Sequence, residues 1–103
     1  MKTAKLTKGD ITEMALKELA YRNCEVWREN NLAVRGRKFT GRKGKPDIIG
    51  YNRSTGLAVY CEVKTVNDFF SEAQEIFLAC AKESGCLCLI ATEEQGQFIL
   101  KPY

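Results

Sequence analysis

The chain has no histidine among its 103 residues, and this absence removes several kinds of active site. Histidine is the usual general acid or base near neutral pH and the commonest nitrogen ligand of zinc. Schemes built on a histidine base or a histidine–metal motif are therefore excluded. The pair Cys86 and Cys88, with no histidine to join it, is a poor zinc site. The chemistry left open is that of carboxylates and lysines.

Long apolar runs are also missing, so the sequence predicts no membrane span. The lysines within residues 1–9 are not followed by an apolar stretch, as they would be in a signal peptide. We expect this segment to be a flexible lead-in to a single domain that spans residues 1–103. Five cysteines, an odd number without a secretory signal, predict reduced thiols and a cytoplasmic protein. The small size favours an oligomer.

Acidic residues are scarce in the first part of the chain. Residues 1–45 contain 12 Lys or Arg and 5 Asp or Glu, a net charge of +7, whereas residues 46–103 contain 4 and 8, a net charge of −4. Such a basic half indicates a polyanionic partner. Six cations within residues 35–45, on a glycine-rich loop without acids, are candidate nucleic-acid ligands: Arg35, Arg37, Lys38, Arg42, Lys43 and Lys45.

The hydrophobic pattern predicts an α/β fold with elements in the order αβββαββ. The helix between the third and fourth strands allows a parallel crossover, so we expect a central mixed sheet flanked by helices. Asp10 followed by Glu13 has capping-box spacing and marks the first helix, and Ser71 followed by Gln74 marks the second. The expected elements are a helix from Asp10 to about Asn23, strands at Cys24–Arg28, Ile48–Tyr51 and Leu57–Val63, a helix from Ser71 to Ser84, and strands at Cys86–Ala91 and Gln97–Leu100.

Three charged residues lie at the strand ends of the predicted hairpin. Glu62 and Lys64 are two positions apart and project to one face, and Asp47 begins the neighbouring antiparallel strand. Two nearby carboxylates repel each other unless a proton or cation lies between them. Mg²⁺ or Mn²⁺ with oxygen ligands suits such a pair, and Lys64 could position water or stabilise charge on a phosphate. The alternative is a cross-strand ion cluster on the surface, which would add little stability.

These residues carry a resemblance to a known family. Pro46-Asp47 and Glu62-Val63-Lys64 resemble the P-D…(D/E)-x-K signature of restriction-endonuclease-like nucleases. Together with the segments before and after them, over residues 10–92, the pattern is similar to the VRR-NUC (virus-type replication-repair nuclease) family. The flanking segments are Val26–Asn31, Gly44–Gly50 and Ser71–Gln74.

The resemblance implies a restriction-endonuclease-like core and a role for each matching residue. Asp47 and Glu62 would hold Mg²⁺ or Mn²⁺ together with the backbone carbonyl of Val63. Glu13 would be a further acidic group at the metal, or else only the capping residue of its helix. Gln74 would lie near the active site, or else only cap the second helix.

The function that the resemblance implies is hydrolysis of DNA phosphodiester bonds. Small nucleases of this family, from phages or bacteria, act as homodimers on branched DNA such as four-way junctions. The alternatives are a module that binds nucleic acid without cutting it and an interaction domain whose charged strand ends are ordinary surface.

Overall fold

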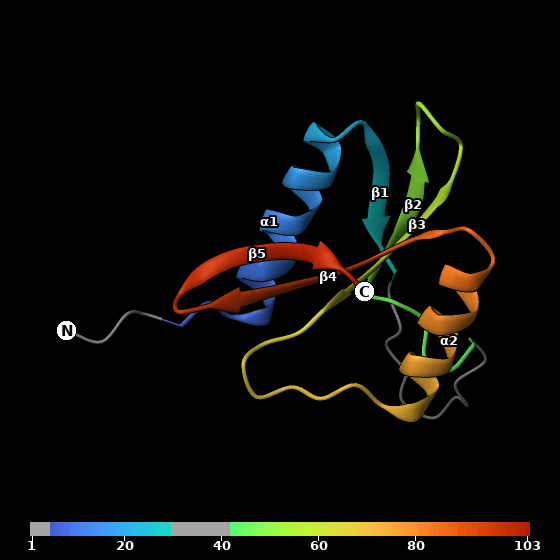
Figure 1. Ribbon diagram of the computed structural model, residues 1–103. Coiled ribbons are helices and arrows are strands. Elements are labelled where there is room, and N and C mark those ends of the chain that lie inside the picture. Colours follow the sequence, from blue (N-terminus) through green and yellow to red (C-terminus); the bar gives the residue numbers. More distant parts are fainter. Residues whose placement is uncertain (1–4, 30–41) are drawn as a thin grey trace, which may run out of the picture.

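The computed structural model describes residues 5–29 and 42–103, and these form the elements in the predicted order (Figure 1). An α/β fold with a mixed five-stranded sheet and two helices is thereby confirmed for the described residues. The elements are α1 (Lys8–Tyr21), β1 (Cys24–Arg28), β2 (Ile48–Asn52), β3 (Ala58–Val63), α2 (Glu72–Glu83), β4 (Leu87–Glu94) and β5 (Gln97–Pro102).

The strands are ordered β1-β2-β3-β4-β5, as they are in the chain. All neighbours are antiparallel except β3 and β4, which are parallel and connected by α2. The register places Ile48 opposite Cys61 and Val63 opposite Ala91. Asp47, just before Ile48, therefore lies beside the end of β3, as the hairpin pattern predicts.

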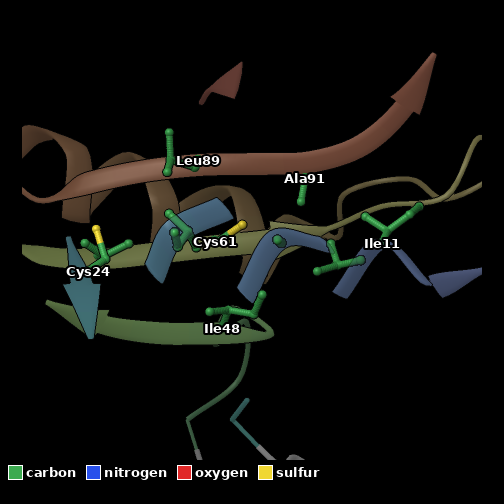
Figure 2. Close-up of a cluster of buried hydrophobic side chains, with 10 residues drawn as sticks. Ile11, Cys24, Ile48, Cys61, Leu89 and Ala91 are labelled. Atoms are coloured by element: carbon green, nitrogen blue, oxygen red, sulfur yellow. The ribbon is translucent and has the colours of Figure 1, made fainter. Parts of the chain in front are cut away.

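The main core lies between α1 and one face of the sheet. Ile11, Ala15 and Leu19 recur at helical spacing and are fully buried against that face (Figure 2). The strand residues of this cluster are Cys24, Ile48, Val59, Cys61, Val63, Leu89 and Ala91. Since side chains alternate along a strand, burial of Cys61 and Val63 on the α1 face directs Glu62 and Lys64 to the opposite face.

Helix α2 packs on that opposite face. The rings of Phe77 and Tyr60 meet edge to face at 5.1 Å, and the Cys88 thiol donates to the Leu78 carbonyl oxygen at 3.7 Å. The predicted capping box is confirmed: Gln74 N–H donates to Ser71 Oγ at 3.1 Å, and Ser71 N–H to Gln74 Oε1 at 2.9 Å. The helix thus begins beside the end of β3.

The N-cap of helix α1 lies three residues earlier than the sequence predicts. This residue is Thr7, whose hydroxyl accepts from Asp10 N–H at 3.0 Å while the Asp10 carboxylate accepts from Thr7 N–H at 2.9 Å. The prediction of Asp10 as the N-cap was wrong, because Thr7 and Asp10 have the same three-residue spacing as Asp10 and Glu13, and the structure forms the earlier capping box. Lys8 and Gly9 belong to α1 rather than to a flexible lead-in.

Helix α1 ends at Tyr21. Asn23 then adopts the left-handed conformation (φ 66°) that turns the chain into β1.

Within the described ranges, neither helix is long and apolar enough to cross a bilayer.

Candidate active site

Asp47 is tied directly to the end of β3. Its Oδ2 accepts from Val63 N–H at 2.9 Å, and its backbone oxygen accepts from Glu29 N–H at 2.8 Å at the end of β1. Pro46, buried and unable to donate to the sheet, precedes it. Asp47 is therefore fixed between two strand ends, with Oδ1 directed away from the backbone tie.

Glu62 is the most deeply buried charged residue of the site. Its side chain is 1% exposed, and no polar group within residues 5–29 and 42–103 bonds to its Oε2. The pKa of Glu62 is raised to about 9, first by burial, then by a hydrogen bond to the Asp47 side chain and by the Asp47 charge. Burial beside Asp47 therefore favours the protonated form of the Glu62 carboxyl.

Lys64 is buried on the same face and oriented by three groups. Its side chain, 8% exposed, donates to the Phe69 carbonyl oxygen at 3.0 Å and to Gln74 Oε1 at 2.8 Å. Its Nζ also lies 4.8 Å from the centroid of the Phe70 ring, a cation–π distance. An ammonium has three donors, so these two bonds leave one for a further acceptor.

Gln74 caps α2, as one of its two predicted roles requires, and it also contacts Lys64. Its role in the active site stays a prediction. Its Oε1 accepts from Ser71 N–H in the capping box and from Lys64 Nζ. The start of α2 and the position of the lysine are thus coupled through a single amide oxygen.

Two site residues escaped the sequence analysis. Lys8, on the first turn of α1, places Nζ 3.7 Å from Asp47 Oδ1. Asp68 lies in the connector after β3, where its Oδ2 accepts from Thr65 N–H and Oγ, and these two hydrogen bonds are the main cause of its lowered pKa, to which the charges of Lys8 and Lys64 add. Lys8 was hidden by the late prediction of the helix start, and nothing in the sequence near Asp68 distinguishes it from a turn residue.

Glu13 lies apart from the pair in what the structure shows. It is exposed on α1, and the observed capping box of Thr7 and Asp10 removes its expected capping role. No group of three or more His, Cys, Asp or Glu in the described part of the chain is arranged to hold a metal, so Glu13 does not complete a set with Asp47 and Glu62. Its role at a metal stays a prediction.

The remaining donors fit a hard divalent cation. Asp47 and Glu62 offer carboxylate oxygens, the donors that Mg²⁺ prefers. The unpartnered, buried Glu62 Oε2 is an acceptor that a cation would satisfy. With two carboxylates, a metal would also need water or a backbone oxygen such as the predicted Val63 carbonyl.

The basic segment is described only from Arg42 onward; Arg35, Arg37 and Lys38 lie outside the described residues. The Arg42 guanidinium lies 5.2 Å from the centroid of the Phe77 ring on α2. Lys43 is exposed, whereas Lys45 Nζ is paired with Glu29 Oε1 at 3.0 Å. Of these three predicted ligands, Lys45 is the one already engaged by an acid.

Gly44 brings this segment against α2. Its φ is +82°, and a Cβ there would lie 2.3 Å from the Ala73 carbonyl oxygen. A hollow of about 380 Å³ lies between the segment and the first turn of α2, lined by Arg42, Lys43, Gly44, Lys45, Ser71, Ala73 and Gln74. Gln74 therefore lines this basic hollow and also accepts a hydrogen bond from the buried Lys64.

Known proteins resemble this chain in fold and in sequence. The fold is similar to that of Hjc, a Holliday junction resolvase from the archaeal hyperthermophile Archaeoglobus fulgidus, with a TM-score of 0.58 and 18% identity over 89% of this chain and 74% of that one. No curated protein matches the chain. The sequence pattern of the VRR-NUC domain matches residues 13–93, most of the chain and all of the carboxylate–lysine site. The protein therefore belongs to the VRR-NUC domain family.

Proposed function

We propose that the protein is a Mg²⁺- or Mn²⁺-dependent nuclease that hydrolyses DNA phosphodiester bonds at Asp47, Glu62 and Lys64. The observation that carries the proposal is the buried Glu62 Oε2, which lacks a partner among the described residues and belongs to a carboxylate placed beside Asp47 by the hairpin register. Lys64 is buried on the same face. Membership of the VRR-NUC family and the resolvase-like fold support the same conclusion.

A purely structural role explains this arrangement poorly. Exposed ion pairs contribute about 0–1 kcal/mol, and burying two adjacent carboxylates costs stability rather than adding it. The raised pKa of Glu62 is a measure of that cost. Groups with strongly shifted pKa values gather at functional sites because their chemistry requires them there.

Each residue has a specific task in the proposed hydrolysis. Asp47 and Glu62, with the Val63 carbonyl, would hold the cation, and Glu13, which lies apart from them, would assist only through water. The chemistry supplied by a bound Mg²⁺ or Mn²⁺ is neutralisation of phosphate charge and acidification of water. Lys64, held by Gln74 and Phe69, directs its remaining donor to the attacking water or to a phosphate oxygen. Water adds to phosphorus, one ester P–O bond breaks, and the leaving oxygen takes a proton.

Branched DNA, such as a four-way junction, is the proposed substrate, with a homodimer as the active form. The similar fold of Hjc, described as a Holliday junction resolvase, supports the substrate. A symmetric junction offers two equivalent strands, which suits two active sites related by a twofold axis. Ile76, 53% exposed on α2, is apolar surface that a second copy could cover. All five cysteines are free, which agrees with a reducing cytoplasm, as in a bacterium or a phage-infected host.

Cleavage of labelled DNA tests the proposal. The wild type is incubated with four-way junction, flap, duplex and single-stranded DNA in Mg²⁺, Mn²⁺ or EDTA. Asp47→Asn and Lys64→Met are compared with the exposed controls Glu83→Gln and Lys17→Met, which make the same changes of charge elsewhere. We expect the wild type and the controls to cut in either metal and the two site variants to bind without cutting.

One result would replace the proposal with its alternative. If the wild type binds junctions but cuts nothing in either metal, the protein is a binding module that has kept the fold. Equal cleavage by Lys64→Met and Lys17→Met would remove Lys64 from the mechanism while leaving the carboxylates in place.

A further inference from the structure

Lys8 approaches the one carboxylate oxygen of Asp47 that the backbone does not use. Asp47 Oδ2 is bonded to Val63 N–H, whereas Oδ1 lies 3.7 Å from Lys8 Nζ. Oδ1 therefore keeps both of its lone pairs free of backbone hydrogen bonds and is the Asp47 oxygen most available to a cation. The ammonium of Lys8 is the charged group that the structure places beside this oxygen.

The position of Lys8 is determined by the start of α1. The capping box of Thr7 and Asp10 closes the first turn, and Thr12 Oγ donates to the Lys8 carbonyl oxygen at 2.7 Å. One residue before the cap, Leu6 N–H donates to Oε1 of the buried Glu93 at 3.1 Å. These contacts fix the Lys8 backbone beside the site, while its side chain, 55% exposed, is free to change direction.

The Lys8 ammonium lies beside a pair of acids, because the hairpin register places Asp47 next to the buried Glu62. A divalent cation among the same oxygens would repel the ammonium, since like charges at such short range are unfavourable.

We propose that Lys8 is a built-in counter-ion of Asp47 that a divalent cation displaces and that then contacts a phosphate of the nucleic acid. This inference rests on the proposed metal site. It makes metal binding and DNA binding cooperative, because the cation frees a positive side chain at the edge of the active site. It also assigns a specific role to the first turn of α1.

Metal affinity tests the first half of the proposal. Mn²⁺ binding to the full chain is measured by titration calorimetry for Lys8→Gln, with Lys17→Gln as the matched control. Lys17 is exposed on the same helix, about 13 Å further along it, and its loss changes the net charge equally. Loss of a competing ion pair should tighten Mn²⁺ binding about two- to fivefold relative to the control. Equal or weaker binding by Lys8→Gln overturns the proposal.

DNA affinity tests the second half. Junction binding is measured against salt concentration in Ca²⁺ and in EDTA. In Ca²⁺, Lys8→Gln should bind more weakly than Lys17→Gln, with the log–log salt slope smaller by about one phosphate contact. In EDTA the two variants should have the same slope. Equal slopes in Ca²⁺ would show that the freed lysine contacts no phosphate and would overturn the proposal.

The same titrations separate this inference from the proposed function. If Mn²⁺ binds neither the wild type nor Asp47→Asn, the metal site itself is refuted and the inference falls with it. If Mn²⁺ binds the wild type but not Asp47→Asn, while Lys8→Gln and Lys17→Gln are alike, only the role of Lys8 is refuted. Thermal unfolding of each variant confirms that the fold is intact.

Discussion

Glu62→Gln tests whether the buried carboxylate pair holds a proton in the metal-free protein. The pKa of Glu62 rises from 4.5 to about 9, with burial as the largest cause. The unfolded chain releases this proton above pH 4.5, whereas the folded protein keeps it until about pH 9. Unfolding therefore releases a proton, and stability falls as the pH rises through this window. Glutamine is similar in size, can donate to Asp47 as the protonated acid does, and has no proton to lose.

The size of the effect follows from the linkage relation. One pKa unit corresponds to about 1.4 kcal/mol. Between pH 5 and pH 8 the folded protein keeps the Glu62 proton and the unfolded chain does not, so the free energy of unfolding falls by about this amount for each pH unit. The wild type should then lose at most about 4 kcal/mol of stability relative to Glu62→Gln over that interval. Residual solvation of the carboxylate makes the observed loss smaller.

Urea denaturation in EDTA at three pH values provides the measurement. The free energy of unfolding of the exposed control Glu83→Gln should change with pH as that of the wild type does. Glu62→Gln should become more stable than both as the pH rises. With Mn²⁺ present the order should reverse, because only the wild type keeps both charged ligands. Parallel stability profiles of the wild type and Glu62→Gln in EDTA would refute the shared proton and weaken the case for a metal site.

Three further predictions follow from single contacts. Gly44→Ala should lower the free energy of unfolding by about 1–3 kcal/mol in a urea melt, because its Cβ would clash with the α2 backbone. Gly56 also has a positive φ but has open space around it, so Gly56→Ala should lower the free energy of unfolding by less. Gln74→Ala and Ser71→Ala should each lower the free energy of unfolding by about 1 kcal/mol, because each removes part of the cap of α2. Only Gln74→Ala should also lower the cleavage rate, because Gln74 alone of the two orients the buried Lys64. Ile76→Glu should shift the sedimentation coefficient toward that of a monomer; an unchanged value would exclude this surface of α2 from the dimer.

Local patterns predicted much of the fold. The strand Cys24–Arg28 is observed with the predicted bounds, and the hairpin and Ser71 cap are confirmed. Their signals are local: alternation of side chains, turn residues and capping spacing all act within a few residues. The predicted start of α1 was wrong because two capping patterns overlap in the sequence, Thr7 with Asp10 and Asp10 with Glu13. The structure forms the earlier one, and Leu6 just before it is held by the buried Glu93.

The family, the order of the elements and the placement of Asp47 beside Glu62 could all be predicted from the amino-acid sequence, because the hairpin and the alternation of side chains put both acids at strand ends. How these groups interact became clear from the folded structure. Burial left Glu62 Oε2 without a partner in the described structure, packing of α2 brought Gln74 to Lys64, and the anchored first turn of α1 brought Lys8 to Asp47. The physical reason is that these contacts join segments far apart in the chain, and their energies depend on solvent exclusion, which no local pattern encodes.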